Sequence, residues 1–145
     1  MTDQGPNQPN VQEAVPFFRV ADIQASVRFY VDGLGCTMTH QWTPKGRLQW
    51  CRLQLGNAAL MLQEKRPPWD DPGKPSGKLG DGVSIPFMCR DAVAIYRELK
   101  SRGLNASRPF VGNGLWVTLI SDPDGYKLEF ESPTDAPEES VYQGE

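Results

Sequence analysis

Histidine and cysteine are scarce in this 145-residue chain. The one histidine, His40, falls in a predicted strand, where we expect an exposed or hydrogen-bonded side chain rather than a metal ligand or an acid–base group. The three cysteines, Cys36, Cys51 and Cys89, are an odd number and lack the paired spacing of zinc sites. We therefore expect small buried thiols and no redox or metal centre built on cysteine.

A long hydrophobic run is also missing. No stretch of the sequence is long and apolar enough to span a membrane, and the first residues lack the charged and then apolar pattern of a signal sequence. With 39% hydrophobic residues, the chain can bury the core of one globular domain. We expect a cytoplasmic protein with no membrane partner.

Positive charge is missing from both ends of the chain. Residues 1–13 and 134–145 contain six acidic residues and no lysine or arginine, and we expect both segments to be disordered tails. The net charge is −3, but outside the tails 15 basic residues stand against 12 acidic ones. The basic residues are scattered among acids and form no cluster, which argues against nucleic acid as a partner.

What the chain does contain is an internal repeat. Residues 20–30 (VADIQASVRFY) are echoed by residues 89–99 (CRDAVAIYREL), and each copy follows a short apolar stretch. The aspartate in each copy, Asp22 or Asp91, can cap the N-terminus of a helix, and a glycine shortly after each copy can end that helix. The repeat predicts two copies of one structural unit.

Each copy predicts elements in the order strand, helix, strand, strand, strand. In the first half these elements are expected over residues 15–20, 22–34, 37–42, 48–55 and 58–63. In the second half they are expected over residues 83–89, 91–102, 107–111, 116–120 and 126–131. We therefore predict an α+β fold with two tandem βαβββ modules in one domain, residues 14–133: the modules are residues 14–64 and 82–133, and a linker loop, residues 65–81, joins them.

Side chains alternate between the two faces of a strand, and this alternation predicts a helix-covered face and an open face. In the first half the open face is rich in aromatic side chains and arginine. The segment Trp50-Cys-Arg-Leu53 is similar to Trp116-Val-Thr-Leu119, and matching the two places Trp50 and Trp116 at equivalent open positions. An open face that carries tryptophans and charged groups predicts a binding surface or an interface.

The repeated βαβββ order, the V-x-D-x-x-x-S-x-x-F-Y motif of residues 20–30 and the D-P-D-G-x-x-x-E-F motif of residues 122–130 resemble the vicinal oxygen chelate superfamily. This superfamily includes glyoxalase I, extradiol dioxygenases, fosfomycin-modifying enzymes, methylmalonyl-CoA epimerase and the bleomycin resistance proteins. The resemblance covers about residues 14–132. It implies a curved mixed sheet with an open cleft, helices on the outer face, and a homodimer. Because one scaffold carries many chemistries, it does not decide the function.

Enzymes of this superfamily hold a divalent metal with His, Glu or Gln side chains from the first and last strands of each module. The resemblance places these four positions at Val15, Met61, Ser84 and Glu129. Val and Met offer no hard donor atom, and one carboxylate with one hydroxyl would hold a divalent ion weakly. We therefore expect no metal, no other cofactor and no catalytic residues, and an enzyme is disfavoured.

The remaining, metal-free branch resembles the bleomycin resistance proteins, which bind planar drugs by stacking in clefts at a dimer junction. The resemblance implies a metal-independent binding protein for a small aromatic or anionic molecule, with antibiotic sequestration as one such role. Arginines in the cleft suit a carboxylate, phosphate or enolate better than cationic bleomycin. The predicted ligand-binding residues are Phe17, Arg19, Trp42, Trp50, Arg52, Met61, Ser84, Phe110, Trp116, Thr118 and Glu129, and Trp69 of the linker is a further candidate wall.

Two other functions stay open. One is a metal-dependent lyase, isomerase or dioxygenase-like enzyme that uses Glu129 and His40. The other is a non-catalytic module whose open face binds another protein. Metal content distinguishes the first from a binding protein, and a change in tryptophan fluorescence on ligand addition distinguishes the second.

Overall fold

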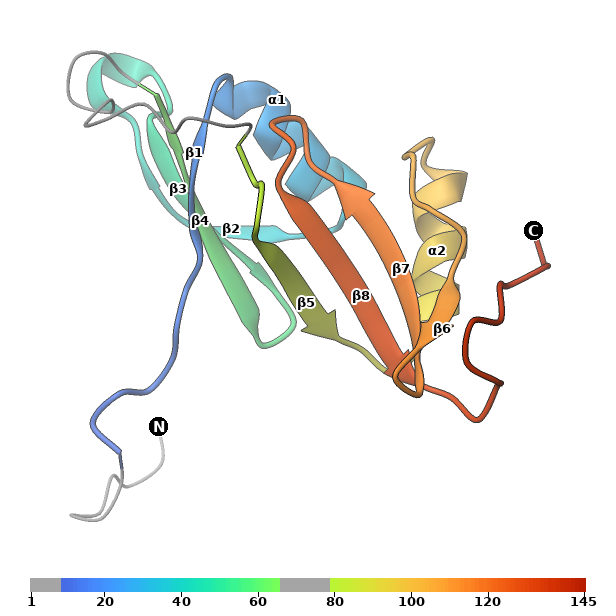
Figure 1. Cartoon of the computed structure of the whole chain (residues 1–145). Helices are drawn as coiled ribbons and strands as arrows, with labels where there is room; N and C mark the ends of the chain where they lie inside the picture. Colours follow the sequence, from blue (N-terminus) through green and yellow to red (C-terminus); the bar gives the residue numbers. More distant parts are fainter. Residues whose placement is uncertain (1–8, 66–78) are drawn as a thin grey trace.

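The computed structural model describes residues 9–65 and 79–145, and within them the strands form two four-stranded mixed sheets (Figure 1). The first sheet has the order β1-β4-β3-β2 and is built from β1 (Phe17–Val20), β2 (Thr37–Trp42), β3 (Trp50–Leu55) and β4 (Ala58–Glu64). The second has the order β5-β8-β7-β6 and is built from β5 (Ser84–Met88), β6 (Phe110–Gly112), β7 (Leu115–Ser121) and β8 (Lys127–Pro133). The predicted α+β fold with two βαβββ modules is confirmed.

One main helix connects the first two strands of each module. The helical segments are α1 (Ile23–Val27), the π-helical η1 (Arg28–Gly33) that continues it, a short 3-10 turn η2 (Pro44–Gly46), and α2 (Ala92–Ser101). Asp22 and Asp91 cap their helices as predicted: the Asp22 carboxylate accepts hydrogen bonds from the backbone N–H groups of Gln24 and Ala25, and the Asp91 carboxylate accepts one from that of Ala94. Over the described ranges, no helix is both long and apolar enough to cross a membrane.

The last strand of each module also holds the start of its helix. Glu64 in β4 accepts a hydrogen bond from the backbone N–H of Ile23 at 3.0 Å, and Ser132 in β8 accepts one from the N–H of Ala92 at 2.8 Å. Glu64 is also ion-paired with Arg47 at 2.7 Å. These bonds satisfy N–H groups that a helix start leaves without partners and fix each helix on one face of its own sheet.

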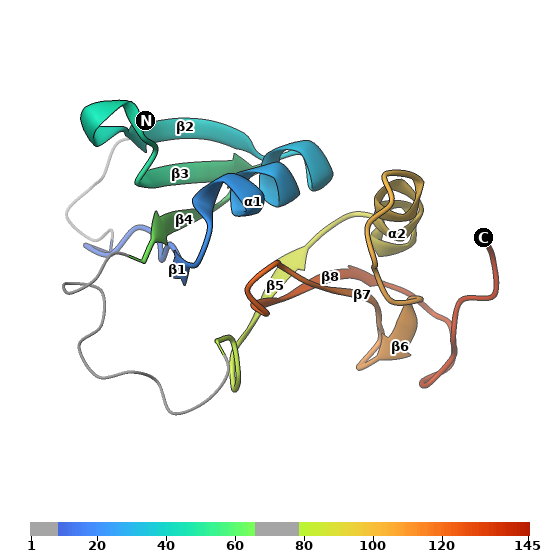
Figure 2. The same ribbon diagram turned by 90° about the horizontal axis from the view of Figure 1, so that it is seen from above.

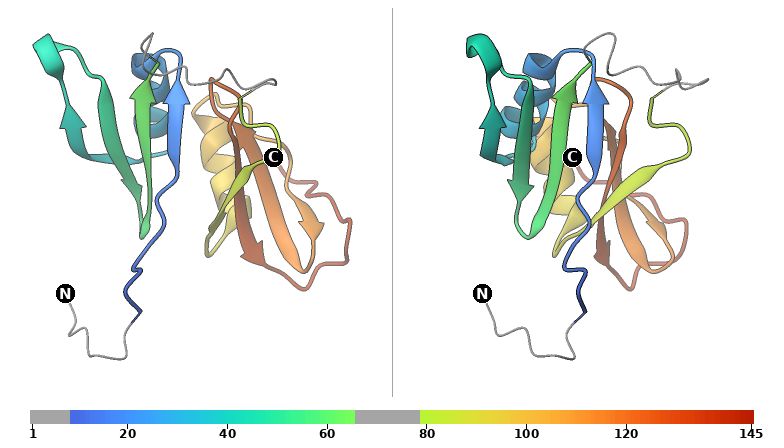
Figure 3. Two further views of the ribbon diagram at one scale, coloured as in Figure 1. Left: turned by 60° about the vertical axis from the view of Figure 1, so that its left-hand side comes forward. Right: turned by 90° about the vertical axis from the view of Figure 1, so that its left-hand side faces the viewer.

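Both helices lie in the angle between the two sheets (Figures 2 and 3). Each sheet therefore has a helix-covered face that points inward and a helix-free face that points outward, and the two helix-free faces point away from each other. In the described residues, no strand of the first sheet pairs with a strand of the second. This arrangement differs from the expected single curved sheet with helices outside, because the two helix-covered faces share one core.

A buried hydrogen-bond cluster joins the modules at this shared core. The Tyr30 hydroxyl donates to the Asp122 carboxylate at 2.8 Å, and the other oxygen of Asp122 accepts from the backbone N–H groups of Asp124 and Tyr126 at 2.9 and 2.8 Å. The backbone N–H of Ala21 donates to Asp124 at 3.0 Å. Burial raises the pKa of Asp122 and of Tyr30. The Asp-Pro-Asp-Gly turn of the second module thus holds the first helix in place by hydrogen bonds to Ala21, just before the helix, and to Tyr30 within it.

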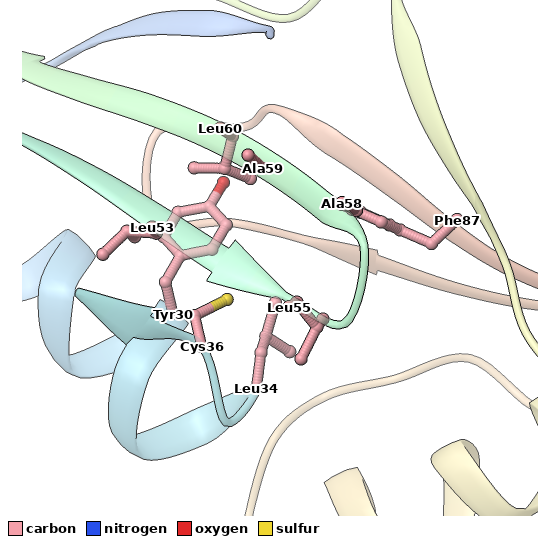
Figure 4. A pocket seen from close by; sticks show the side chains of 9 residues that line it. All are labelled: Tyr30, Leu34, Cys36, Leu53, Leu55, Ala58, Ala59, Leu60 and Phe87. Carbon is pink, nitrogen blue, oxygen red and sulfur yellow. The ribbon is translucent and has the colours of Figure 1, made fainter. Parts of the chain in front are cut away.

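Beside Tyr30 lies an apolar crevice between the modules (Figure 4). It holds about 220 Å³ of empty space but is nowhere wide enough for a water molecule. Its lining residues are Tyr30, Leu34, Cys36, Leu53, Leu55, Ala58, Ala59, Leu60 and Phe87. Among these residues only Phe87 comes from the second module, and its side chain lies beside Ala58 at one end of the crevice. The crevice is a seam in the packing, too narrow for a ligand.

The C-terminal residues 134–145 lie along β6 (Figure 1). The Glu138 carboxylate accepts hydrogen bonds from the backbone N–H groups of Asn113 and Gly114, in the turn between β6 and β7, at 2.6 and 2.9 Å. Val111 in β6 also exchanges backbone hydrogen bonds with this segment. The segment therefore covers an edge of the second sheet, which differs from the expected disordered tail.

Tyr142 anchors the same segment on the helix-covered side of the sheet. Its ring contacts the rings of Tyr96 and Trp116 edge-on, with centroids 6.2 Å apart in both pairs. The Arg97 guanidinium lies over the Tyr142 ring at 5.3 Å from the centroid. Aromatic contacts of this kind stabilise a fold by more than their buried area alone.

The three thiols differ in accessibility, and we predict that they differ in reactivity. Burial raises the pKa of Cys36 and of Cys51 to about 11, so both are protonated and shielded at pH 8. Cys89 is half-buried, and burial raises its pKa as well. We expect iodoacetamide to label Cys89 first and the other two only on unfolding, as read by mass spectrometry. Equal labelling of all three in the folded protein would contradict this.

Candidate functional site

The helix-free face of the first sheet gathers most of the predicted site residues of the first module. Strand register places them in two rows across the four strands, in the order β1, β4, β3, β2. One row is Arg19, Gln63, Trp50 and Trp42, and the other is Phe17, Met61, Arg52 and His40. We call these eight residues the aromatic face. Trp42 and Phe17 are 53% and 43% exposed, so large apolar surface reaches solvent here.

The arginines of the aromatic face are held in place by their neighbours. The Arg19 guanidinium lies over the Phe17 ring, 4.5 Å from its centroid. Arg52 donates from Nη1 to Thr39 Oγ1 and to Gln54 Oε1, both at 3.1 Å. A guanidinium fixed in this way loses little freedom on binding a ligand. The face therefore offers flat apolar surface beside positioned positive charge.

Three predicted residues lie on the helix-free face of the second sheet instead. The Ser84 hydroxyl donates to Glu129 at 3.0 Å, and both residues line a groove of about 520 Å³. Phe110 in β6 lies on the same face, opposite Val117 in β7. Because the two helix-free faces point apart, these residues and the aromatic face do not form one cleft within the chain.

Trp116 and Thr118 are not on the helix-free face, and this part of the prediction is wrong. Thr118 is fully buried and donates to the backbone C=O of Ala92 at the start of α2, at 2.9 Å. Trp116 packs against Tyr142 on the same side. The Trp50 segment and the Trp116 segment were matched one residue out of register. Such a slip moves every side chain to the opposite face.

Strand pairing gives the correct match between the modules. Gln63 pairs with Arg19 and Trp50, and at the equivalent place in the second sheet Glu131 pairs with Met88 and Val117. Trp50 is therefore equivalent to Val117. The second module consequently has no tryptophan on its helix-free face among the described residues.

Two members of the aromatic face were not predicted as ligand-binding residues. Gln63 shares the alternation of Met61, so extending that alternation along β4 would have found it. His40 lies opposite Arg52 only because the register of β2 shifts between Met38 and His40. No pattern in the sequence indicates that irregularity.

A groove of about 530 Å³ lies beside Phe17, between β1 and the segment that leads into β5. Its lining residues are Ala14, Val15, Pro16, Phe17, Phe18, Gly80, Asp81, Val83, Ile85 and Tyr126. The groove is mostly apolar and extends the aromatic face toward the second module. Trp69 and most of the predicted linker loop, residues 65–81, lie outside the described residues.

The side chains at the positions that hold a metal in related enzymes are unsuited to binding a metal here. Val15 and Met61 belong to the first module, and Glu129 of the second module is engaged by Ser84. A valine and a methionine cannot supply hard ligands, so at most one carboxylate and one hydroxyl remain. Over residues 9–65 and 79–145, no three His, Cys, Asp or Glu side chains are grouped closely enough to bind a metal.

Three solved structures share the fold of this chain. A bleomycin-binding protein in complex with bleomycin is 22% identical with a TM-score of 0.64, over 86% of this chain and 100% of that chain. TnmS3, an antibiotic-binding protein from Streptomyces sp. CB03234, is 20% identical with a TM-score of 0.64, over 85% and 98%. A glyoxalase family protein from Enterococcus faecalis is 23% identical with a TM-score of 0.64, over 83% and 97%.

Sequence comparison gives the family. A comparison with curated proteins found no match. The family model of the Glyoxalase/Bleomycin resistance protein/Dioxygenase superfamily matches residues 12–130, which span both modules. The chain therefore belongs to the Glyoxalase/Bleomycin resistance protein/Dioxygenase superfamily.

Proposed function

We propose that this protein is a metal-independent binding protein for a small planar molecule, aromatic or anionic, and that the aromatic face is its site. The observation that carries the proposal is the gathering of Phe17, Trp42 and Trp50 on one helix-free face. Neighbouring large apolar side chains on one exposed face are typical of a binding or interaction surface. The likeness to a bleomycin-binding protein and to antibiotic-binding TnmS3 supports sequestration of an antibiotic as one form of this function.

The geometry of the tryptophans defines how a ligand would bind. Trp42 and Trp50 are direct partners across β2 and β3, so their side chains stand next to each other and form one platform. A planar ligand would stack on this platform, and its second side needs another wall. Since the second sheet faces away, we propose that a second copy of the chain supplies that wall, in a homodimer.

The side chains at the expected metal-ligand positions argue against a metal-dependent enzyme. A metal-dependent lyase, isomerase or dioxygenase would need ligands where Val15 and Met61 stand, and neither residue offers one. The charge of Arg19 and Arg52 also suits a negatively charged molecule better than a cationic drug. A cytoplasmic location stays a prediction.

The stacking role of Trp50 can be tested against Trp116 as a matched control. We predict that Trp50→Ala weakens binding of 2-naphthalenemethanol, a neutral planar probe, by about 1 to 3 kcal/mol, because a stacking surface is lost. Trp116→Ala should leave this affinity unchanged and lower the free energy of unfolding by about 2 kcal/mol, because Trp116 packs against Tyr142. Calorimetric titration and urea unfolding measure the two effects.

The same titration in EDTA tests metal independence. We expect the affinity of the wild-type protein for 2-naphthalenemethanol to be the same with and without the chelator. Loss of binding in EDTA, or equal loss of affinity in Trp50→Ala and Trp116→Ala, would contradict the proposed function.

A further inference from the structure

Arg52 occupies the middle of the aromatic face. It lies in β3 between Met61 of β4 and His40 of β2, and its side chain is 22% exposed. Nη1 already donates to Thr39 and Gln54. These two bonds hold the guanidinium plane and leave its other edge, which carries Nη2, directed to a different partner.

That partner is a carboxylate from the N-terminal segment. Glu13 Oε1 lies 3.8 Å from Arg52 Nη2, a distance too long for a strong hydrogen bond. The Glu13 side chain is 60% exposed, and its segment precedes β1 without regular structure. An exposed ion pair of this kind adds little stability, so a better acceptor can replace it.

We propose that Arg52 is the anchor for a carboxylate on the planar ligand, and that Glu13 occupies this anchor until the ligand displaces it. This inference rests on the proposed function of the aromatic face. A ligand carboxylate can approach the open edge of the guanidinium with both oxygens, whereas Glu13 makes one long contact. The N-terminal segment is thus a built-in competitor for the site.

The spacing between platform and anchor fits such a ligand. Trp50 precedes Arg52 by two residues on one strand, so the two side chains stand about 7 Å apart on the same face. This spacing is comparable with the length of a two-ring aromatic carboxylate. Trp42, the partner of Trp50, widens the platform on the same side of Arg52. The ring system would stack on the tryptophans while the carboxylate reaches the guanidinium.

The test compares 2-naphthoate with neutral 2-naphthalenemethanol by calorimetric titration of the full-length chain. We expect Arg52→Gln to weaken 2-naphthoate binding about tenfold or more, because charge-assisted hydrogen bonds are lost. Arg52→Lys should cause an intermediate loss of affinity for 2-naphthoate, because lysine keeps the positive charge but cannot make the bidentate hydrogen bonds of a guanidinium. Either change should weaken binding of the neutral probe much less than binding of 2-naphthoate, because the neutral probe has no carboxylate to pair with the guanidinium.

Removal of the Glu13 carboxylate should raise the affinity for 2-naphthoate. Glu13→Gln should strengthen 2-naphthoate binding about two- to fivefold, because the ligand no longer displaces an ion pair. Glu139→Gln removes one negative charge near the other end of the chain and should leave the affinity for 2-naphthoate unchanged.

The outcomes separate this inference from the proposed function. If the neutral probe still needs Trp50 but 2-naphthoate binds Arg52→Gln as tightly as wild type, the inference is overturned and the proposed function stands. Tighter binding in Glu139→Gln equal to that in Glu13→Gln would also overturn it, since net charge would then explain both. If neither probe binds the wild-type chain, the proposed function fails together with the inference.

Discussion

Tyr30→Ala is expected to lower the free energy of unfolding by about 4 kcal/mol, the range for removing a fully buried aromatic side chain. Tyr30 has no exposed surface, and its hydroxyl donates to Asp122 in the other module. The variant therefore leaves a cavity in the shared core and also leaves the buried Asp122 carboxylate without one of its donors. Urea denaturation followed by circular dichroism measures the loss.

Two further variants separate the ring from the hydroxyl. Tyr30→Phe removes only the cross-module hydrogen bond and should cost about 1 kcal/mol. Leu99 stands at the position of the second helix that corresponds to Tyr30, eight residues after the capping aspartate, and it is 2% exposed. Leu99→Ala should cost about 3 kcal/mol through its cavity alone. A loss below 1 kcal/mol for Tyr30→Ala would contradict the shared core.

Deletion of residues 138–145 is expected to lower the free energy of unfolding by about 3 kcal/mol. The deletion exposes the surface that Tyr142 covers on Trp116 and Tyr96, and it removes the Glu138 carboxylate from two backbone N–H groups. It also uncovers the edge of β6. Thermal and urea unfolding of the shortened chain measure the effect.

A shorter deletion is the matched control. Removing residues 143–145 keeps Glu138 and Tyr142 and loses only exposed contacts, such as the Arg108 bond to the backbone of Gly144. It should cost less than about 1 kcal/mol. If the longer deletion costs no more than the shorter one, the segment is the loose tail that its composition indicates.

The fold could be predicted because its signals are local. Asp22 and Asp91 are helix caps that the sequence shows directly, and the alternation of β3 and β4 places Trp50 and Met61 on the helix-free face as expected. The repeat then doubles the evidence, since each module confirms the order of elements in the other.

What could not be predicted depends on contacts between distant segments. The match of Trp116 with Trp50 was based on local sequence similarity. The true register is fixed by the pairing of β7 with β8. The C-terminal segment has a polar, acidic composition, yet Tyr142 and Glu138 find partners on the second module. The direction in which the two sheets face depends on packing between the modules, which neither module encodes alone.

The parallel pairing of the first and last strands has a consequence for synthesis. Residues 17–20 leave the ribosome before their strand partner, residues 58–64, which follows about 4 s later at ordinary elongation rates. The acceptor of the Tyr30 hydroxyl, Asp122, is made later still. Once residue 64 has emerged from the ribosome the first sheet can close, but the Tyr30 hydroxyl then has no acceptor from the second module. The first module therefore completes its buried hydrogen bonds only after the second module has been synthesised.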